Sequence, residues 1–220
     1  MSGNSELRSI IGPLNIYSLL ALAGIVGPVF LIITFLTAAF SVSGYSFIGD
    51  SISSLAWTPM GWLQSIGFLF AGFMVVFFTL GLFFSIRGTR GFKIGIGLIV
   101  LFGFGLLIIG AFKDDPAGSP HTIQGMIHMV TAGIVFSVFP IGSLLIGLSL
   151  RKDPYWKGLF IHTIFTTGLA SAFVIGYLFL PEQLSWFGLY ERVLLLNIVI
   201  WLEIMAIKLL RLSLSTSDGK

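Results

Sequence analysis

Residues 94–112 read IGIGLIVLFGFGLLIIGAF, a stretch that contains no charged side chain. A helix rises about 1.5 Å per residue, so about 20 apolar residues cross a hydrocarbon core that is about 30 Å thick. Comparable windows occur on both sides of this stretch, and together the predicted spans are 14–37, 61–86, 92–112, 122–150, 158–180 and 189–210. The sequence therefore predicts an all-α polytopic membrane protein with six transmembrane helices in one bundle.

The composition excludes a water-soluble domain. Only 10% of the 220 residues are charged, whereas 56% are hydrophobic, and soluble domains carry roughly 25% charged residues. A single globule of this size could not hide that much apolar surface. The chain has no cysteine, which excludes disulfides and thiolate chemistry. It also lacks a long run of Lys and Arg, so we expect no nucleic acid partner.

The connections between the predicted spans are short, and no linker or internal repeat divides the chain. We therefore expect residues 1–220 to form a single domain. Gly91 and Gly95 form a GxxxG pair, and Ser143 and Gly147 are a second small-residue pair. Small residues allow helices in lipid to approach closely. These Gly-rich faces could pack within the chain or join copies of it in a homo-oligomer, and the sequence leaves both open.

The basic residues predict the orientation of the protein. Cytoplasmic flanks of transmembrane segments accumulate Lys and Arg, and all but two of the 12 basic residues fall on one side of the predicted topology. They are Arg8, Arg87, Arg90, Lys93, Arg151, Lys152, Lys157, Lys208, Arg211 and Lys220. Only Lys113 and Arg192 oppose them. This asymmetry predicts a plasma or inner membrane protein with both termini in the cytoplasm.

The stretch 113–128, KDDPAGSPHTIQGMIH, holds two of the three histidines. Ser119 and Pro120 are typical of an N-cap and a first helical position, which would place His121 and His128 on one helix face. Residues seven apart are separated by about 10 Å along the axis, so both cannot bind one zinc ion. A zinc site would need one histidine together with residues from other spans, such as Asp50, Asp114 or Glu191. The alternative is a neutral, hydrogen-bonded His128 and a solvated His121.

The loop 45–57, YSFIGDSISSLAW, follows the first span. Asp50 and Ser53 resemble a helix start, and the apolar residues after them predict a short amphipathic turn at the membrane interface. The serines lack a histidine beside them in sequence and a Gly-x-Ser-x-Gly elbow, which favours helix capping over a nucleophilic role.

Two polar contacts are predicted between spans, one ion pair and one hydrogen bond. Arg192 could pair with Asp114 or Asp115, or could bind an anionic head group. Toward the cytoplasmic half, His162 and Glu203 lie at comparable depths, and a hydrogen bond between them would lower the cost of burying each. A proton path through Glu203, His162 and His128 is the alternative.

Several short motifs follow one another in a recognisable order. They are DSISSL at 50–55, an acidic turn with proline before the fourth span, HTIQGMIH at 121–128 and GLYER at 188–192. With the six short-looped spans, they resemble the prokaryotic membrane proteins grouped as domain of unknown function 998. The resemblance covers nearly the whole chain and implies a six-helix architecture. It also implies that Asp50, His121, His128, Glu191 and Arg192 are candidate functional residues, but it implies no reaction.

A more distant likeness is to polytopic hydrolases of the alkaline ceramidase type, whose zinc is held by histidines and an aspartate. This chain differs from them because it has six predicted spans rather than seven and no late HxxxH pair.

Three functions follow as hypotheses. The first is an integral membrane protein of unassigned activity that binds membrane lipids or a partner at an outer polar cluster. The cluster comprises Asp50, Asp114, Asp115, His121, His128, Glu191 and Arg192. The second is a lipid hydrolase at the outer leaflet, in which His121 or His128 holds zinc together with Asp50 or Asp114. The third is a small proton-linked transporter. The first hypothesis expects no cofactor, and whether the chain is an enzyme stays open.

Overall fold

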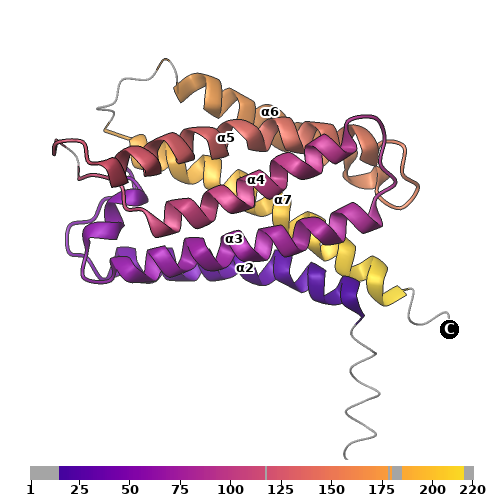
Figure 1. Ribbon diagram of the computed structural model, residues 1–220, viewed down its shortest axis with the longest axis horizontal. Coiled ribbons are helices and arrows are strands. Elements are labelled where there is room, and N and C mark those ends of the chain that lie inside the picture. The colour runs from indigo at the N-terminus through magenta and orange to yellow at the C-terminus, as the bar shows by residue number, and fades with distance from the viewer. Residues whose placement is uncertain (1–14, 117, 178, 180–184, 216–220) are drawn as a thin grey trace, which may run out of the picture.

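The protein is a bundle of six long helices. The computed structural model describes residues 15–116, 118–177, 179 and 185–215, and Figure 1 shows the helices running side by side along the long axis of the molecule. They are α2 (Ile16–Phe40), α3 (Gly61–Ser85), α4 (Phe92–Ala111), α5 (Ile123–Leu150), α6 (Phe160–Tyr177) and α7 (Phe187–Ser215). Two short turns, η1 (Ser53–Trp57) and η2 (Lys157–Leu159), precede α3 and α6. All six long helices are sufficiently long and apolar to cross a membrane, which confirms the all-α fold and its six spans.

Helix α5 has nearly the bounds of the predicted span 122–150, but the residues that cap its start differ from those predicted. Ser119 and Pro120 do not begin the helix; Thr122 is its N-cap, and the Thr122 hydroxyl accepts the Gly125 N–H at 3.0 Å. The reason is Asp115, whose carboxylate accepts the Thr122 N–H at 2.8 Å and the Thr122 hydroxyl at 2.7 Å. The Ser119 hydroxyl instead donates to the Pro116 carbonyl at 2.7 Å, so it closes a turn before the helix.

The other boundaries lie close to the predicted ones. α2 begins after Asn15, whose side chain accepts the Ser18 N–H at 2.9 Å; residue 14, where the first span was predicted to start, lies outside the described residues. α7 is longer than predicted at both ends. The predicted range 158–180 for the fifth span is described as helix from Phe160 to Tyr177, and residues 178 and 180 lie outside the described part.

Neighbours in sequence are neighbours in space. Each long helix contacts the next one along the chain, and α7 returns to pack against α2, so the six helices form a closed ring. Helix α6 is the least buried of them, because its buried residues are only Thr163, Thr166, Thr167 and Ala170. Figure 1 shows α6 at the edge of the bundle. The buried side chains of this helix are therefore all small.

Small residues bring helices of the same chain together. A Cβ added at Gly95 of α4 would lie 2.9 Å from the Gly142 carbonyl oxygen of α5, so only glycine permits this approach. Ser143 of α5 and Thr167 of α6 share a hydrogen bond of 2.8 Å between their hydroxyls. These faces are therefore used inside the bundle, and a homo-oligomer stays a prediction.

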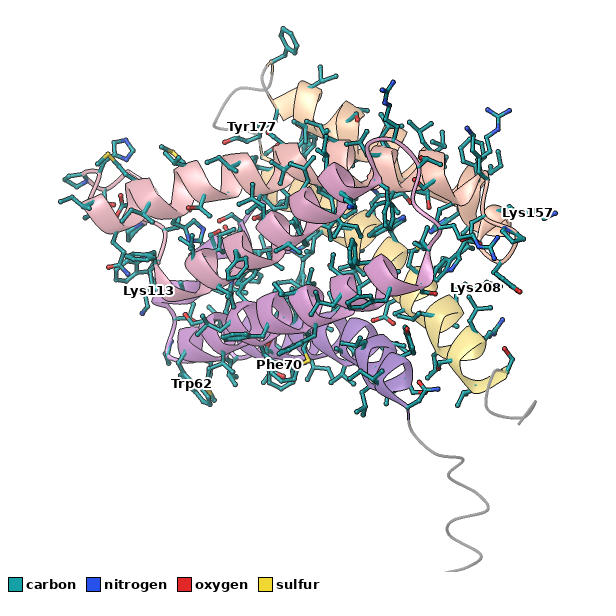
Figure 2. The ribbon with its side chains drawn as sticks, turned by 45° about the vertical axis from the view of Figure 1, so that its right-hand side comes forward. Trp62, Phe70, Lys113, Lys157, Tyr177 and Lys208 are labelled. Atoms are coloured by element: carbon teal, nitrogen blue, oxygen red, sulfur yellow. The ribbon has the colours of Figure 1, made fainter. Side chains whose placement is uncertain are left out.

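Charge separates the two ends of the bundle. We call one end the acidic end; it comprises loops 41–60 and 112–122 and the start of α7, and it carries Asp50, Asp114, Asp115 and Glu191. The opposite, basic end carries Arg87, Arg90, Lys93, Arg151, Lys152, Lys157, Lys208 and Arg211, while Arg8 and Lys220 lie outside the described residues. Figure 2 shows Trp62 and Lys113 at one end, and Lys157 and Lys208 at the other. The ends thus differ as the topology predicted, and the cytoplasmic position of the basic end stays a prediction.

Candidate functional site

A cavity of about 420 Å³ lies between α5, α6 and α7 at the acidic end. One part of its lining is polar and consists of Ser51, Ser53, Asp114, His128 and Glu191. Most of the remaining lining is apolar and includes Met129, Ala132, Phe136, Phe173, Val174 and Leu194, and its polar members are Ser137, Tyr177 and Tyr190. The cavity is therefore amphipathic, with most of its polar groups supplied by the two loops of the acidic end and by the second turns of α5 and α7.

His128 connects the two loops at the polar end of the cavity. Its Nδ1 lies 2.7 Å from the Phe112 carbonyl oxygen, and its Nε2 lies 3.0 Å from the Ser53 hydroxyl oxygen. A carbonyl oxygen only accepts hydrogen bonds, so in the neutral ring the proton sits on Nδ1 and Nε2 accepts the Ser53 hydroxyl. The side chain is buried, with only 5% of the residue exposed. Loop 51–54 has no histidine beside it in sequence, but the fold brings His128 to Ser53.

The start of α7 holds the loop that carries Ser53. The Glu191 carboxylate accepts the Ile52 N–H at 2.7 Å, and the Leu189 N–H donates to the Ile48 carbonyl at 2.9 Å. A Cβ at Gly188 would lie 2.2 Å from the Asp50 carbonyl oxygen, so glycine is required where α7 meets the loop. Because Ile52 is the neighbour of Ser53, Glu191 fixes the backbone that presents this hydroxyl.

Arg192 also holds this loop against the start of α7. It does not form the predicted pair with Asp114 or Asp115. Its guanidinium donates to the Asp50 carbonyl at 2.7 Å and to the Tyr45 hydroxyl. It also lies over the rings of Phe35, Tyr45 and Phe47, 5.3 to 5.4 Å from their centroids. The start of α7 passes beside loop 45–51, so aromatic faces and carbonyls reach Arg192 first. Arg192 is only 8% exposed and is not presented to a lipid head group.

The Tyr45 side chain connects Arg192 to the backbone just before Ser53. Its hydroxyl donates to the Ser51 carbonyl at 2.9 Å. Burial raises the pKa of Tyr45 to about 12, although the nearby Arg192 guanidinium opposes that rise. The hydroxyl therefore keeps its proton, and its role as donor to Ser51, throughout the physiological range.

Two further contacts fix the loop from the other side. The Gln64 side-chain amide of α3 donates to the Ile52 carbonyl at 2.6 Å. The Trp57 indole N–H donates to the Asp114 carbonyl at 2.6 Å, and the Lys113 ammonium lies 5.2 Å from the Trp57 ring centroid. Ser53 is thus held by α3, α5, α7 and the loop that precedes α5.

The remaining residues of the predicted polar cluster do not join the cavity. The Asp50 carboxylate accepts the Ser46 N–H of its own loop at 2.7 Å. Asp115 caps α5, and the hydrogen bonds from Thr122 lower the pKa of the Asp115 carboxyl. The exposed His121 lies 3.9 Å from Asp115, measured between Nδ1 and Oδ2. The predicted cluster is therefore divided: Asp114, His128 and Glu191 line the cavity, while the other members stabilise the loops and the start of α5.

The zinc ligands predicted from sequence are not assembled. Within the described ranges, no group of three or more His, Asp or Glu side chains could hold a metal ion. His121 and His128 lie at different places, because α5 starts after His121 and only His128 is inside the helix. Asp50 is turned toward the backbone of its own loop.

The match to known families is consistent with this architecture. Residues 25–208 match the family described as "Protein of unknown function (DUF998)". The chain belongs to this family. No curated protein and no solved structure matches the chain. The matched range extends from α2 into α7, so it includes every polar residue that lines the cavity. The more distant likeness to alkaline-ceramidase-type hydrolases stays a prediction.

The inner pair predicted for this DUF998 protein is not formed. His162 Nε2 and Glu203 Oε1 are both buried, and neither has a hydrogen-bond partner among the described residues. Helix α6 presents other groups to α7: the Trp201 indole N–H donates to the Thr163 hydroxyl, and the Asn197 amide donates to the Thr166 carbonyl, both at 3.0 Å. His162 precedes Thr163 by one residue and so lies on another face of α6. A proton path through these groups stays a prediction.

Sequence reasoning missed Ser53 and Tyr45 as members of the site of this DUF998 protein. Ser53 is 75 positions from His128 and Tyr45 is 147 from Arg192, so no local spacing signals either contact. A partial signal does exist. A histidine placed inside an apolar span needs a polar partner, and the serine-rich loop 51–54 is predicted at the same side of the membrane.

Proposed function

We propose that this DUF998 protein is a cell-membrane protein that binds one neutral acyl lipid in the cavity at its acidic end. The observation that carries the proposal is the division of the cavity lining into a polar part and an apolar part. An acyl lipid has the same division. We further propose that the basic end faces the cytoplasm, because Lys and Arg accumulate on that side of membrane proteins, which places the cavity toward the outer leaflet.

The dimensions of the cavity support one lipid chain. Its volume of about 420 Å³ lies within the range of about 300–1,000 Å³ that is usual for small-molecule sites. Along α5 the lining extends from His128 to Ser137, which is about 14 Å at 1.5 Å per residue. The apolar part therefore runs along the helix axis, parallel to the acyl chains of the surrounding bilayer.

The charges of the cavity favour a neutral head group. Two acidic side chains, Asp114 and Glu191, line the polar part, and no Lys or Arg is among the described lining residues. A phosphate head group would be repelled by these carboxyl groups without a cation to neutralise it. Hydroxyl and ester oxygens could instead form hydrogen bonds with Ser51 and Ser53. A monoacylglycerol has both kinds of oxygen.

A leucine placed in the cavity tests this function. A Cβ at Gly133, which lines the cavity, has no atom within 4 Å, so Gly133→Leu adds a side chain to open space without a clash. Gly97→Leu is the matched control, because a Cβ at Gly97 of α4 also has no atom within 4 Å and Gly97 is not a lining residue. The probe is a monoacylglycerol with a diazirine in its acyl chain, added to the protein in nanodiscs.

We expect Gly133→Leu to reduce the photo-crosslinking yield about tenfold, which corresponds to roughly 1.4 kcal/mol of lost binding. Gly97→Leu should leave the yield unchanged. Equal yields for wild type and Gly133→Leu, with both proteins folded, would show that the lipid does not bind in this cavity.

A further inference from the structure

The polar part of the cavity contains a chain of three groups: the Ser53 hydroxyl, the His128 imidazole and the Phe112 carbonyl. The distances are 3.0 Å from Ser53 Oγ to His128 Nε2 and 2.7 Å from Nδ1 to the carbonyl oxygen. Serine nucleophiles are activated by an imidazole within about 2.6–3.2 Å, which a third group orients. We propose, on the basis of the proposed lipid binding, that Ser53 and His128 cleave the acyl ester of the bound lipid through an acyl-serine intermediate.

The tautomer fits this role. The Phe112 carbonyl fixes the Nδ1 proton, which leaves the Nε2 lone pair directed at the Ser53 hydroxyl. Both Ser53 and His128 also line the cavity, so the pair is not closed off from a ligand. A hydrogen bond that served only to join two loops would have no need to border a lipid-sized cavity.

The surrounding charges suit an imidazole that gains a proton. When His128 takes the proton from Ser53 it becomes a cation in a buried place, which is costly unless negative groups lie nearby. The Asp114 and Glu191 side chains line the same cavity, and the Phe112 carbonyl already contacts Nδ1. Glu191 has a second effect as a positioning residue, because its bond to the Ile52 N–H holds the backbone next to Ser53.

An ester is the bond that the cavity would place at Ser53. In an acyl lipid the ester carbonyl is the first polar group that follows the hydrocarbon chain. With the chain along Ala132, Phe136 and Phe173, that carbonyl lies where the apolar lining meets Ser53 and His128. Ser51 lines this boundary as well; its oxygen accepts the Ser54 N–H at 3.1 Å, which leaves its hydroxyl proton free to turn toward the carbonyl oxygen.

The reaction has two balanced steps. In the first, Ser53 Oγ bonds to the ester carbonyl carbon, His128 Nε2 takes the hydroxyl proton, and the carbon–oxygen bond to the alcohol breaks as Nε2 returns that proton to the departing oxygen. In the second, water attacks the acyl-serine, Nε2 takes a proton from the water, and Ser53 leaves with that proton. The products are a fatty acid and the free alcohol, and no oxidant or reductant is consumed.

A lipid-like fluorophosphonate with a long alkyl chain tests the nucleophile directly, because it bonds covalently to an activated serine. Full-length protein in nanodiscs is treated and its intact mass is followed, and the labelled peptide is then mapped. We expect one adduct, on Ser53, that Ser53→Ala abolishes and that His128→Gln slows by about 10²–10⁴-fold. Ser41→Ala is the control, because Ser41 is not among the cavity-lining residues and its hydroxyl donates to the Ala38 carbonyl at 2.7 Å; its labelling should equal that of wild type.

Labelling that persists in Ser53→Ala would overturn the inference, and so would a wild type that does not react. The monoacylglycerol photoprobe, used on the same preparations, distinguishes two failures. If the photoprobe still binds wild type, only the catalytic inference is wrong. If the photoprobe does not bind, the proposed lipid binding is wrong as well.

A cysteine variant keeps the test valid if Ser53→Ala is unstable. The natural chain has no cysteine, so Ser53→Cys and Ser137→Cys each present a single thiol. Iodoacetamide should alkylate Ser53→Cys about 10²-fold faster than Ser137→Cys, because His128 accepts the thiol proton and thiolate is the reactive form. Equal rates would contradict an activating role for His128.

Discussion

The two ends of the bundle both use an acidic side chain to hold a distant loop, but they use it differently. At the basic end, Asp153 is 1% exposed and accepts the N–H groups of Arg87, Tyr155 and Trp156 at 2.8 to 3.2 Å. Both of its oxygens are therefore occupied. At the acidic end, Glu191 accepts only the Ile52 N–H among the described residues, and its side chain borders the cavity.

The difference separates a purely structural carboxylate from one beside a reactive pair. Hydroxyls show the same contrast. At the basic end, Ser149 contacts the Thr89 hydroxyl at 2.7 Å and accepts the Thr89 N–H at 3.1 Å, which closes a loop. At the acidic end, the Ser53 hydroxyl contacts an imidazole that can take its proton. Hydrogen bonds of similar length thus allow different chemistry, because the partner group and the open space beside the bond differ.

The largest expected effect is at the basic end. Asp153→Ala leaves three N–H groups of a buried turn without their acceptor, and each unsatisfied group costs about 1–3 kcal/mol. We expect the free energy of unfolding to fall by about 3–5 kcal/mol, seen as a lower melting temperature in detergent. Asp153→Asn keeps one acceptor oxygen and should lose less. Photoprobe binding per folded molecule should not change, and a loss of binding in folded Asp153→Asn would remove the distinction between the ends.

A smaller effect is expected from Glu191→Gln, and it should change the labelling rate rather than the stability. The amide oxygen can still accept the Ile52 N–H, so the melting temperature should change little. The carboxyl group that lines the same cavity as His128 is replaced by an amide, however, and fluorophosphonate labelling of Ser53 should slow about tenfold because the imidazolium is less stabilised. A variant that melts lower but labels at the wild-type rate would mean that Glu191 acts only as a structural clamp, as Asp153 does.

The smallest effect is a pH dependence that only the acidic end should show. The pKa of Tyr45 is about 12 in the folded protein, above its ordinary value of about 10. Below pH 10 the hydroxyl is protonated in both states, so its contribution to stability is complete. Between pH 10 and 12 only the unfolded chain releases the proton, so stability falls. Urea unfolding across this range should show the decline in wild type and less of it in Tyr45→Phe; identical profiles would contradict the burial of this hydroxyl.

The sequence was sufficient for the spans and the charge of the ends, because hydrophobic length and Lys and Arg counts are local properties. Window 92–112 became helix α4, Phe92–Ala111, almost without change. The contacts within the site could not be predicted in the same way. Arg192 meets Tyr45 and Asp50 because of how α7 approaches a loop 140 or more positions earlier. His162 misses Glu203 because a shift of one residue turns a side chain by about 100° around the helix.

Asp115 shows why residue type alone does not locate the start of a helix. Ser119 and Pro120 are a reasonable helix start by residue type, but the Asp115 carboxylate bonds to Thr122 and moves the start of α5 by several residues. That shift leaves His121 exposed outside the helix and His128 buried inside it. The shared helix face that the sequence predicted for the two histidines is therefore not formed, because one hydrogen-bonded turn sets the start of the helix.

The most direct test locates the two ends of a bound lipid. Monoacylglycerol carrying a diazirine on its glycerol, and a second form with the diazirine in mid-chain, are crosslinked to the protein in nanodiscs, and the modified residues are mapped. The head probe should label loop 51–54 or the segment around Asp114, and the chain probe should label α5 and α6 near Phe136 and Phe173. Labels from both probes on outward faces of the bundle, such as around Phe104 of α4, would contradict a lipid site at the acidic end.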